Sequence, residues 1–231
     1  MAGGVRGLII APRTASPHRR PGAGGRRAWA GVSLLLLVPA MLIEPAQAMA
    51  RMALAWDATR VAAEPWRCWS AAWVHLSALH LGANLAGGVL VLLLGWLARP
   101  PRDAAWAWAL AWPLTHLGLL ALPQVVRYAG MSGVLHAGVA VMAVTLVGCG
   151  RDRVERVVGA LVLVGLAAKL AAEPSWSLGA VRPDGWDIAV VPAAHAIGAG
   201  WGVLLALALV VLPRLRSRPW SPARPPGSWA G

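Results

Sequence analysis

The feature that most constrains this chain is a series of six apolar runs, at about 28–43, 76–98, 104–122, 132–149, 157–172 and 192–212. A helix needs about 20 residues to cross a hydrocarbon core about 30 Å thick, and about 17 is a usual lower limit. The first run is short by this measure and the fifth is marginal. Only 13% of the residues are charged and the mean hydropathy is +0.61, which is too apolar for a soluble domain of this size. The sequence therefore predicts an all-α membrane protein with six transmembrane helices in a lipid bilayer.

The charges between the runs predict the orientation of the helices, because Lys and Arg concentrate on the cytoplasmic side of a membrane. Alternate connections and both ends of the chain hold 15 of the 21 Lys and Arg residues, with three of the nine Asp and Glu residues. The other side is neutral. We therefore expect a disordered basic arm at 1–27, a membrane domain at 28–213 and a basic tail at 214–231, with both termini cytoplasmic. Because the net charge of +12 follows this pattern, we interpret it as topology and expect no nucleic-acid partner.

The first run allows two interpretations. Arg26 and Arg27, the apolar stretch after them and the small residues Ala46-Gln47-Ala48 also match a secretory signal peptide with its cleavage site. A retained span and a cleaved signal both remain open from composition, and the charge pattern is the same under either. On the outer side, the four Trp residues of the connection 44–75 predict interfacial structure, and 173–191 reads as a turn-rich loop.

Polar residues mark the start of the second, fourth and sixth runs. His80 and Asn84 lie four residues apart and share a helix face, Gly130-Met131-Ser132-Gly133 opens the fourth run, and His195 opens the sixth. With the N terminus inside, these three runs all enter the membrane from the outer side. The connectivity therefore predicts that the polar residues meet near one surface.

These residue types suit serine protease chemistry. A serine at a helix start between glycines has an accessible hydroxyl and nearby N–H groups, and Ser132 needs a base, for which His195 is the candidate. His80 and Asn84 could donate to an oxyanion. No acid lies in these three runs, so the sequence predicts a Ser132–His195 dyad without metal or cofactor.

Other interpretations exist for each motif. A Gly-x-Ser-Gly sequence also serves close helix packing, and membrane histidines can relay protons or, as a set of His75, His80 and His195, bind a metal. Lys169 could act as the base in place of His195, but Glu173 four residues later favours an ion pair instead.

Four ordered pieces resemble the rhomboid family of intramembrane proteases over about residues 60–205. They are Trp66-Arg67, the pattern of His75, His80 and Asn84, the GMSG around Ser132 (Gly130 to Gly133), and His195 followed by Gly198 and Gly202. The resemblance implies a six-span fold with a water-filled cavity open to the outer side. It also implies Ser132 and His195 as the catalytic pair, with His80, Asn84 and the Ser132 amide around the oxyanion.

Within that family the sequence is most similar to rhombosortases, which share the GxSGxLH motif ending here at His136 and the Lys-x3-Glu of Lys169 and Glu173. Many rhomboids carry Tyr at the position of His136, so this histidine could support His195. The resemblance implies a bacterial inner-membrane protein with a periplasmic active site. Its partners would be membrane-anchored substrates that end in a Gly-Gly motif, a membrane helix and a basic tail. A non-catalytic rhomboid-like protein that binds clients is the alternative.

Overall fold

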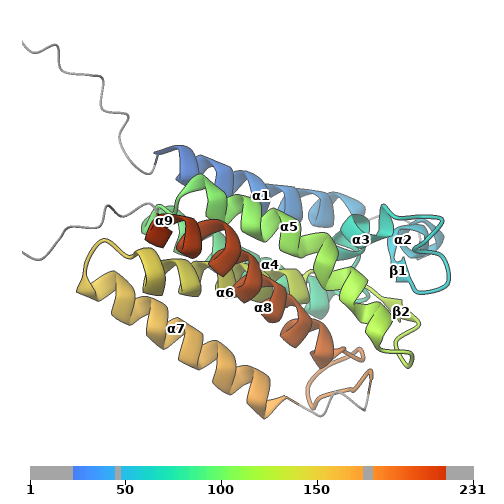
Figure 1. Cartoon of the computed structure of the whole chain (residues 1–231). Helices are drawn as coiled ribbons and strands as arrows, with labels where there is room; N and C mark the ends of the chain where they lie inside the picture. Colours follow the sequence, from blue (N-terminus) through green and yellow to red (C-terminus); the bar gives the residue numbers. More distant parts are fainter. Residues whose placement is uncertain (1–22, 45–47, 174–178, 217–231) are drawn as a thin grey trace, which may run out of the picture.

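The computed structural model describes residues 23–44, 48–173 and 179–216 and is mostly helical. Each of the six apolar runs forms a helix (Figure 1). The helices are α1 (Ala23–Ile43), α4 (Ala78–Ala98), α5 (Arg102–Gly118), α6 (Ser132–Cys149), α7 (Arg153–Ala172) and α8 (Pro192–Ala206). A 3-10 turn, η2 (Leu119–Ala121), prolongs α5, and the π-helical η4 (Leu207–Val211) and then α9 (Leu212–Arg216) prolong α8. The prediction of an all-α membrane protein is therefore confirmed in outline.

Four helical stretches are long and apolar enough to cross a bilayer: Gly24–Ile43, Ala78–Ala98, Ser132–Cys149 and Pro192–Arg216. Within the described ranges, α5 is shorter, with 17 residues, and α7 carries charged residues near both ends. The count of six spans and the cytoplasmic placement of the termini remain predictions. The start of α1 and the end of α9 do lie at the same end of the bundle (Figure 1).

The predicted basic arm ends earlier than the sequence suggested. Helix α1 begins at Ala23, so residues 23–27 are helical rather than part of a disordered arm. Packing explains the difference, because Gly25 contacts the backbone of Pro100 and the Arg26 guanidinium lies 4.7 Å from the centre of the Trp96 ring. The tail is likewise helical as far as Arg216. Residues 1–22 and 217–231, and positions 45–47 of the possible cleavage site, lie outside the described part of the chain.

The connection between α1 and α4 forms a structured layer at one end of the bundle, as its Trp residues predicted. It contains α2 (Ala48–Leu54), α3 (Arg67–Ser70) and the 3-10 turn η1 (Ala71–Trp73). The two-residue strands β1 (Trp56–Asp57) and β2 (Arg127–Tyr128) pair antiparallel beside them (Figure 1). Such short strands show no alternating pattern that a sequence could reveal. The connection that precedes α6 is bound to this layer through the pairing of β2 with β1.

Helix α6 is the central helix, with most of its residues buried, and it packs closely on α8. Glycines permit this approach. A Cβ atom at Gly133 would lie 2.7 Å from the carbonyl oxygen of Ala194, and one at Gly202 would lie 2.5 Å from that of Ala137. Gly198 contacts the Gly133 carbonyl oxygen directly. These contacts define the α6–α8 seam, in which backbone packs on backbone.

Candidate active site

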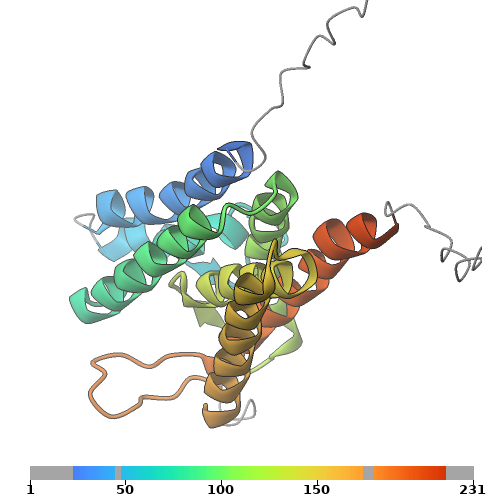
Figure 2. The same cartoon turned by 90° about the vertical axis from the view of Figure 1, so that its left-hand side faces the viewer.

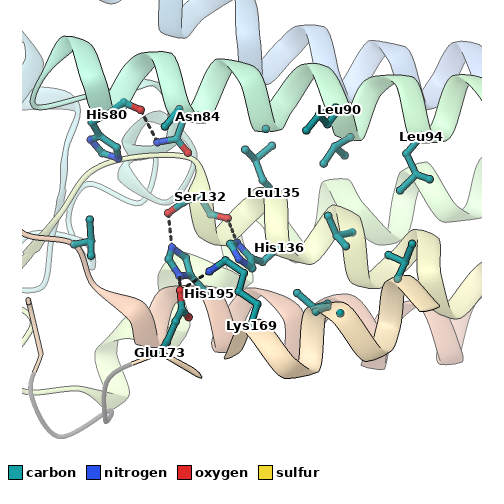
Figure 3. Close-up of a pocket in the computed structure, with 18 of the residues that line it drawn as sticks. His80, Asn84, Leu90, Leu94, Ser132, Leu135, His136, Lys169, Glu173 and His195 are labelled. Carbon is teal, nitrogen blue, oxygen red and sulfur yellow. Dashed lines mark hydrogen bonds and ion pairs between the residues drawn. The ribbon is translucent and has the colours of Figure 1, made fainter. Parts of the chain in front are cut away.

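The starts of α4, α6 and α8 meet at the end of the bundle that carries the β1–β2 pair (Figures 1 and 3). Ser132 is the first residue of α6, and His195 lies in the first turn of α8. Helix α8 begins with Pro192, and proline suits the first position of a helix because an N–H group there would have no acceptor within the helix. His80 and Asn84 lie in the first two turns of α4. The structure therefore brings together the four residues for which the sequence predicted chemistry.

Ser132 and His195 are in direct contact. The Oγ atom of Ser132 lies 2.9 Å from Nε2 of His195, which is within reach for transfer of the hydroxyl proton (Figure 3). The other ring nitrogen of His195, Nδ1, lies 2.7 Å from Oε1 of Glu173. A proton on Nδ1 would bond to this carboxylate and leave Nε2 as the acceptor. The pair thus has the orientation that a nucleophile and its base require.

Glu173 was predicted only as the ion-pair partner of Lys169. The ion pair is present, but the same carboxylate oxygen also contacts His195, so the three side chains share one atom (Figure 3). This contact was not predicted from the sequence, because no acid lies in the three runs that begin on the outer side. The fifth run ends there, and Glu173 directly follows the last residue of α7. The geometry is that of a Ser-His-Glu triad rather than an isolated dyad.

A recess next to Ser132 contains hydrogen-bond donors. Gly130 has φ +119°, a conformation that favours glycine, and a Cβ there would lie 2.7 Å from the His80 ring and 3.9 Å from Nδ2 of Asn84. Glycine therefore allows the His80 ring to pack close to this turn. Asn84 donates one N–H to the carbonyl oxygen of His80 at 3.0 Å, and this bond orients its amide. The first N–H groups of α6, including that of Ser132, have no acceptor within the helix.

His136 lies one turn after Ser132 and packs on the ring of His195. Its ring stacks on that of His195 with centroids 4.2 Å apart and planes 14° apart. Its Nδ1 lies 2.7 Å from the backbone oxygen of Ser132, which fixes the ring (Figure 3). His136 therefore packs against one face of His195, which agrees with the supporting role suggested by the sequence.

A cavity of about 670 Å³ opens beside Ser132 and His195. Ser132, His195, Glu173, His80 and Asn84 lie at one end of it. The rest is apolar and runs between α4 and α7 over α6, with a wall that includes Gly87, Leu90, Leu94, Leu135, Val139, Val162, Gly165 and Leu166 (Figure 3). We call this part the α4–α7 groove. A second cavity of about 240 Å³ reaches Ser132 and His80 from the side of Arg127 and Tyr128.

The loop 179–191 borders the groove at its polar end. It reaches from between α7 and α8 toward the side of α4 (Figure 2), where Oγ of Ser77 donates to Oδ1 of Asp187 at 2.8 Å. Trp186 lines the cavity and lies 6.4 Å from the His80 ring, centre to centre. The segment is rich in turns and bends, as the sequence predicted, and its location on the outer side stays a prediction.

The remaining predicted residues support the site from a distance. His75 packs edge-on against His80 with centroids 4.8 Å apart, and burial lowers its pKa to about 4, so the ring is neutral near pH 7. Arg67 is buried and donates to the carbonyl oxygen of Ala55 at 2.6 Å, whereas Trp66 is exposed on the surface of the end layer. Gly198 and Gly202 belong to the α6–α8 seam.

Tyr128 contacts Ser132 although no sequence motif pointed to it. Its hydroxyl lies 3.3 Å from Oγ of Ser132. The available signal was its position four residues before the serine, as the only tyrosine of the chain.

Among the described residues, no group of three His, Cys, Asp or Glu side chains is arranged to hold a metal ion. No protein-family model matches the sequence, and no curated protein is similar enough to indicate a relative.

Proposed function

We propose that this chain is an intramembrane serine endopeptidase of the rhomboid type, with Ser132 as nucleophile and His195 as base. The observation that carries the proposal is the 2.9 Å contact between Ser132 Oγ and His195 Nε2 at the polar end of an apolar cavity among membrane helices. Serine attacks an amide only when a neighbouring base accepts its proton.

The proposed reaction has two stages. Ser132 Oγ attacks the carbonyl carbon of the scissile peptide bond while its proton passes to Nε2 of His195. The imidazolium is stabilised by the carboxylate of Glu173 and then donates the proton to the leaving amine, so that an acyl ester on Ser132 remains. Water attacks this ester with His195 again as the base, which releases the carboxylate product and restores the serine.

The negative charge that develops on the carbonyl oxygen needs donors. His80, Asn84 and Ser132 line the same end of the cavity, so the His80 ring, the Asn84 amide and the Ser132 N–H are the proposed oxyanion donors. One such donor contributes about 3–4 kcal/mol in a serine protease. The turn at Gly130 directs the chain into α6 with the His80 ring close beside it.

The proposed substrate is a protein anchored by a membrane helix. The α4–α7 groove is lined by Leu and Val side chains and by glycines over most of its length, which suits an apolar segment better than a soluble peptide. We propose C-terminal sorting signals with a Gly-Gly motif, a helix and a basic tail as the substrate class, and the periplasmic face of a bacterial inner membrane as the place of cleavage. The glycines Gly87 and Gly165 in the groove walls leave space for a packed segment.

The test is covalent labelling of the purified protein in mild detergent with a fluorophosphonate, followed by intact mass and peptide mapping. We expect one label, on Ser132, and none on the Ser132→Ala variant. Ser33→Ala is the matched control, because Ser33 is a buried serine in α1 whose hydroxyl bonds to the backbone of Trp29. No labelling of the folded wild-type protein would instead support a client-binding protein without catalysis.

A second experiment separates the two candidate bases. His195→Ala should abolish both labelling and cleavage of a reporter protein with a C-terminal membrane helix, whereas Lys169→Ala should retain part of both, since Lys169 contacts His195 only through Glu173. The opposite ranking would assign the role of base to Lys169.

A further inference from the structure

Ser132 has two side-chain partners. His195 approaches its Oγ atom at 2.9 Å, and the hydroxyl of Tyr128 approaches the same atom at 3.3 Å. A serine hydroxyl has one proton to donate and two lone pairs. When the proton points to His195, the lone pairs remain available, and a tyrosine hydroxyl can donate to one of them.

The strand that carries Tyr128 is well anchored. Tyr128 pairs with Trp56 across the β1–β2 ladder, and its ring lies 5.5 Å from that of His116, centre to centre. His116 is held in turn by a 2.5 Å contact of Nδ1 with the carbonyl oxygen of Cys68. Residues of the end layer and His116 of α5 therefore hold the tyrosine, and Ala193 and Ala194 of α8 belong to the same buried cluster.

The turn between Tyr128 and Ser132 is also fixed. The N–H of Gly130 donates to the carbonyl oxygen of Ala71 at 2.9 Å, and the positive φ of Gly130 directs the chain into α6. Tyr128 is 7% exposed, and burial raises the pKa of its hydroxyl, so the group stays neutral and able to donate at ordinary pH. A group that accepts protons at this position would compete with His195 for the proton of Ser132, whereas a neutral hydroxyl that donates a hydrogen bond does not.

We propose that Tyr128 is a positioning residue that holds the Ser132 hydroxyl in the rotamer that reaches His195. Without a second partner, the side chain of a serine at the start of a helix can turn among staggered rotamers, and only some of them place Oγ near Nε2. The Tyr128 hydroxyl removes this freedom through a contact that comes from a different part of the fold. The inference rests on the proposed function, because it concerns the nucleophile of that reaction.

The first test is Tyr128→Phe, which keeps the ring and removes the hydroxyl. We expect the fluorophosphonate labelling rate and kcat for a membrane-anchored reporter to fall about five- to tenfold, the usual effect of one hydrogen bond, with KM unchanged. The midpoint of thermal unfolding should change by no more than a few degrees. A labelling rate equal to that of the wild type would overturn the inference and leave the proposed function intact, whereas an unlabelled wild-type protein would overturn both.

The second test exploits the single tyrosine of the chain. Biosynthetic replacement of tyrosine by a ring-fluorinated tyrosine changes Tyr128 alone and makes its hydroxyl more acidic. We expect the labelling rate of this protein to fall at alkaline pH, where the ionised hydroxyl can no longer donate to Ser132, and this decline should be missing from the pH profile of the Tyr128→Phe variant. A purely structural hydroxyl would leave the alkaline profile of the fluorinated protein the same as that of the wild type, and this result would overturn the inference even if Tyr128→Phe folded poorly.

Discussion

The α6–α8 seam and the α4–α7 groove lie on neighbouring sides of α6, and both contain glycines, but these glycines have opposite effects. In the seam, Gly133, Gly198 and Gly202 bring two backbones into contact. In the groove, a Cβ at Gly165 would meet no atom within 4 Å, and one at Gly87 would meet only a Leu135 side-chain carbon at 3.2 Å. The same residue type closes one surface and opens the other.

The two surfaces meet different requirements of the candidate site, a fixed geometry in the seam and space for a ligand in the groove. Ser132 and His195 lie on the helices of the seam, whose close packing fixes the distance between them. His80, Asn84 and Glu173 come from the helices that border the groove. The part of the site that must be rigid is thus built on contacting backbones, and the part that must admit a ligand faces open space.

The largest effect is expected from Gly198→Leu, which inserts a side chain into the α6–α8 seam. The new side chain would meet the backbone of Gly133, and overpacking of this kind typically costs about 1–3 kcal/mol or more. We expect the Ser132–His195 contact to be lost, with fluorophosphonate labelling abolished and the thermal unfolding midpoint lowered. The matched control is Gly200→Leu, two residues along the same helix, where no atom lies within 4 Å of an added Cβ. Equal behaviour of the two variants would show that the seam does not position the pair.

The next largest effect is expected from Glu173→Gln, which keeps the size of the side chain but removes its charge. His195 would lose the carboxylate that orients Nδ1 and stabilises the imidazolium, so the labelling rate and kcat should fall by about a hundredfold or more. Thermal unfolding should change little by comparison. If the rate stayed within a fewfold of the wild type, His195 would be acting as part of a dyad, as the sequence alone predicted.

The smallest and most selective effect is expected from Gly165→Leu, which fills the groove and leaves the seam intact. Cleavage of a reporter anchored by a membrane helix should fall at least about tenfold, because the apolar segment loses space. Labelling by a small fluorophosphonate should be unchanged. Gly82→Leu in α4 is the control, since Gly82 is exposed and an added Cβ there meets no atom within 4 Å. Parallel loss of labelling and cleavage would assign Gly165 a role in the fold rather than in substrate binding.

Much of this arrangement could be predicted from the sequence because helix direction follows from connectivity. The apolar runs give the helices, and the alternation of their direction brings the starts of the second, fourth and sixth runs to one end. That argument predicted the meeting of Ser132, His195, His80 and Asn84. It also predicted the Lys169–Glu173 ion pair, which depends only on a spacing of four residues in a helix.

Other parts depended on packing that no local pattern encodes. The contact of Glu173 with His195 requires the last turn of α7 to lie beside the first turn of α8, and the Lys169 pair already supplied a sufficient explanation for the acid. The start of α1 at Ala23 depends on the contact of Gly25 with Pro100. Tyr128 reaches Ser132 because a two-residue strand pair fixes its direction, and such a pair leaves no trace in the hydrophobic periodicity.

The carboxylate that Lys169 and His195 share has a consequence for the charge of the site. In the resting state that the proposed mechanism requires, His195 and Ser132 carry no charge and the ammonium group and the carboxylate cancel. In the proposed tetrahedral intermediate the imidazolium adds one positive charge and the oxyanion one negative charge, so the total is again zero. An apolar surrounding penalises net charge heavily. The reaction would therefore move charge within the site without ever requiring the membrane interior to hold an excess of either sign.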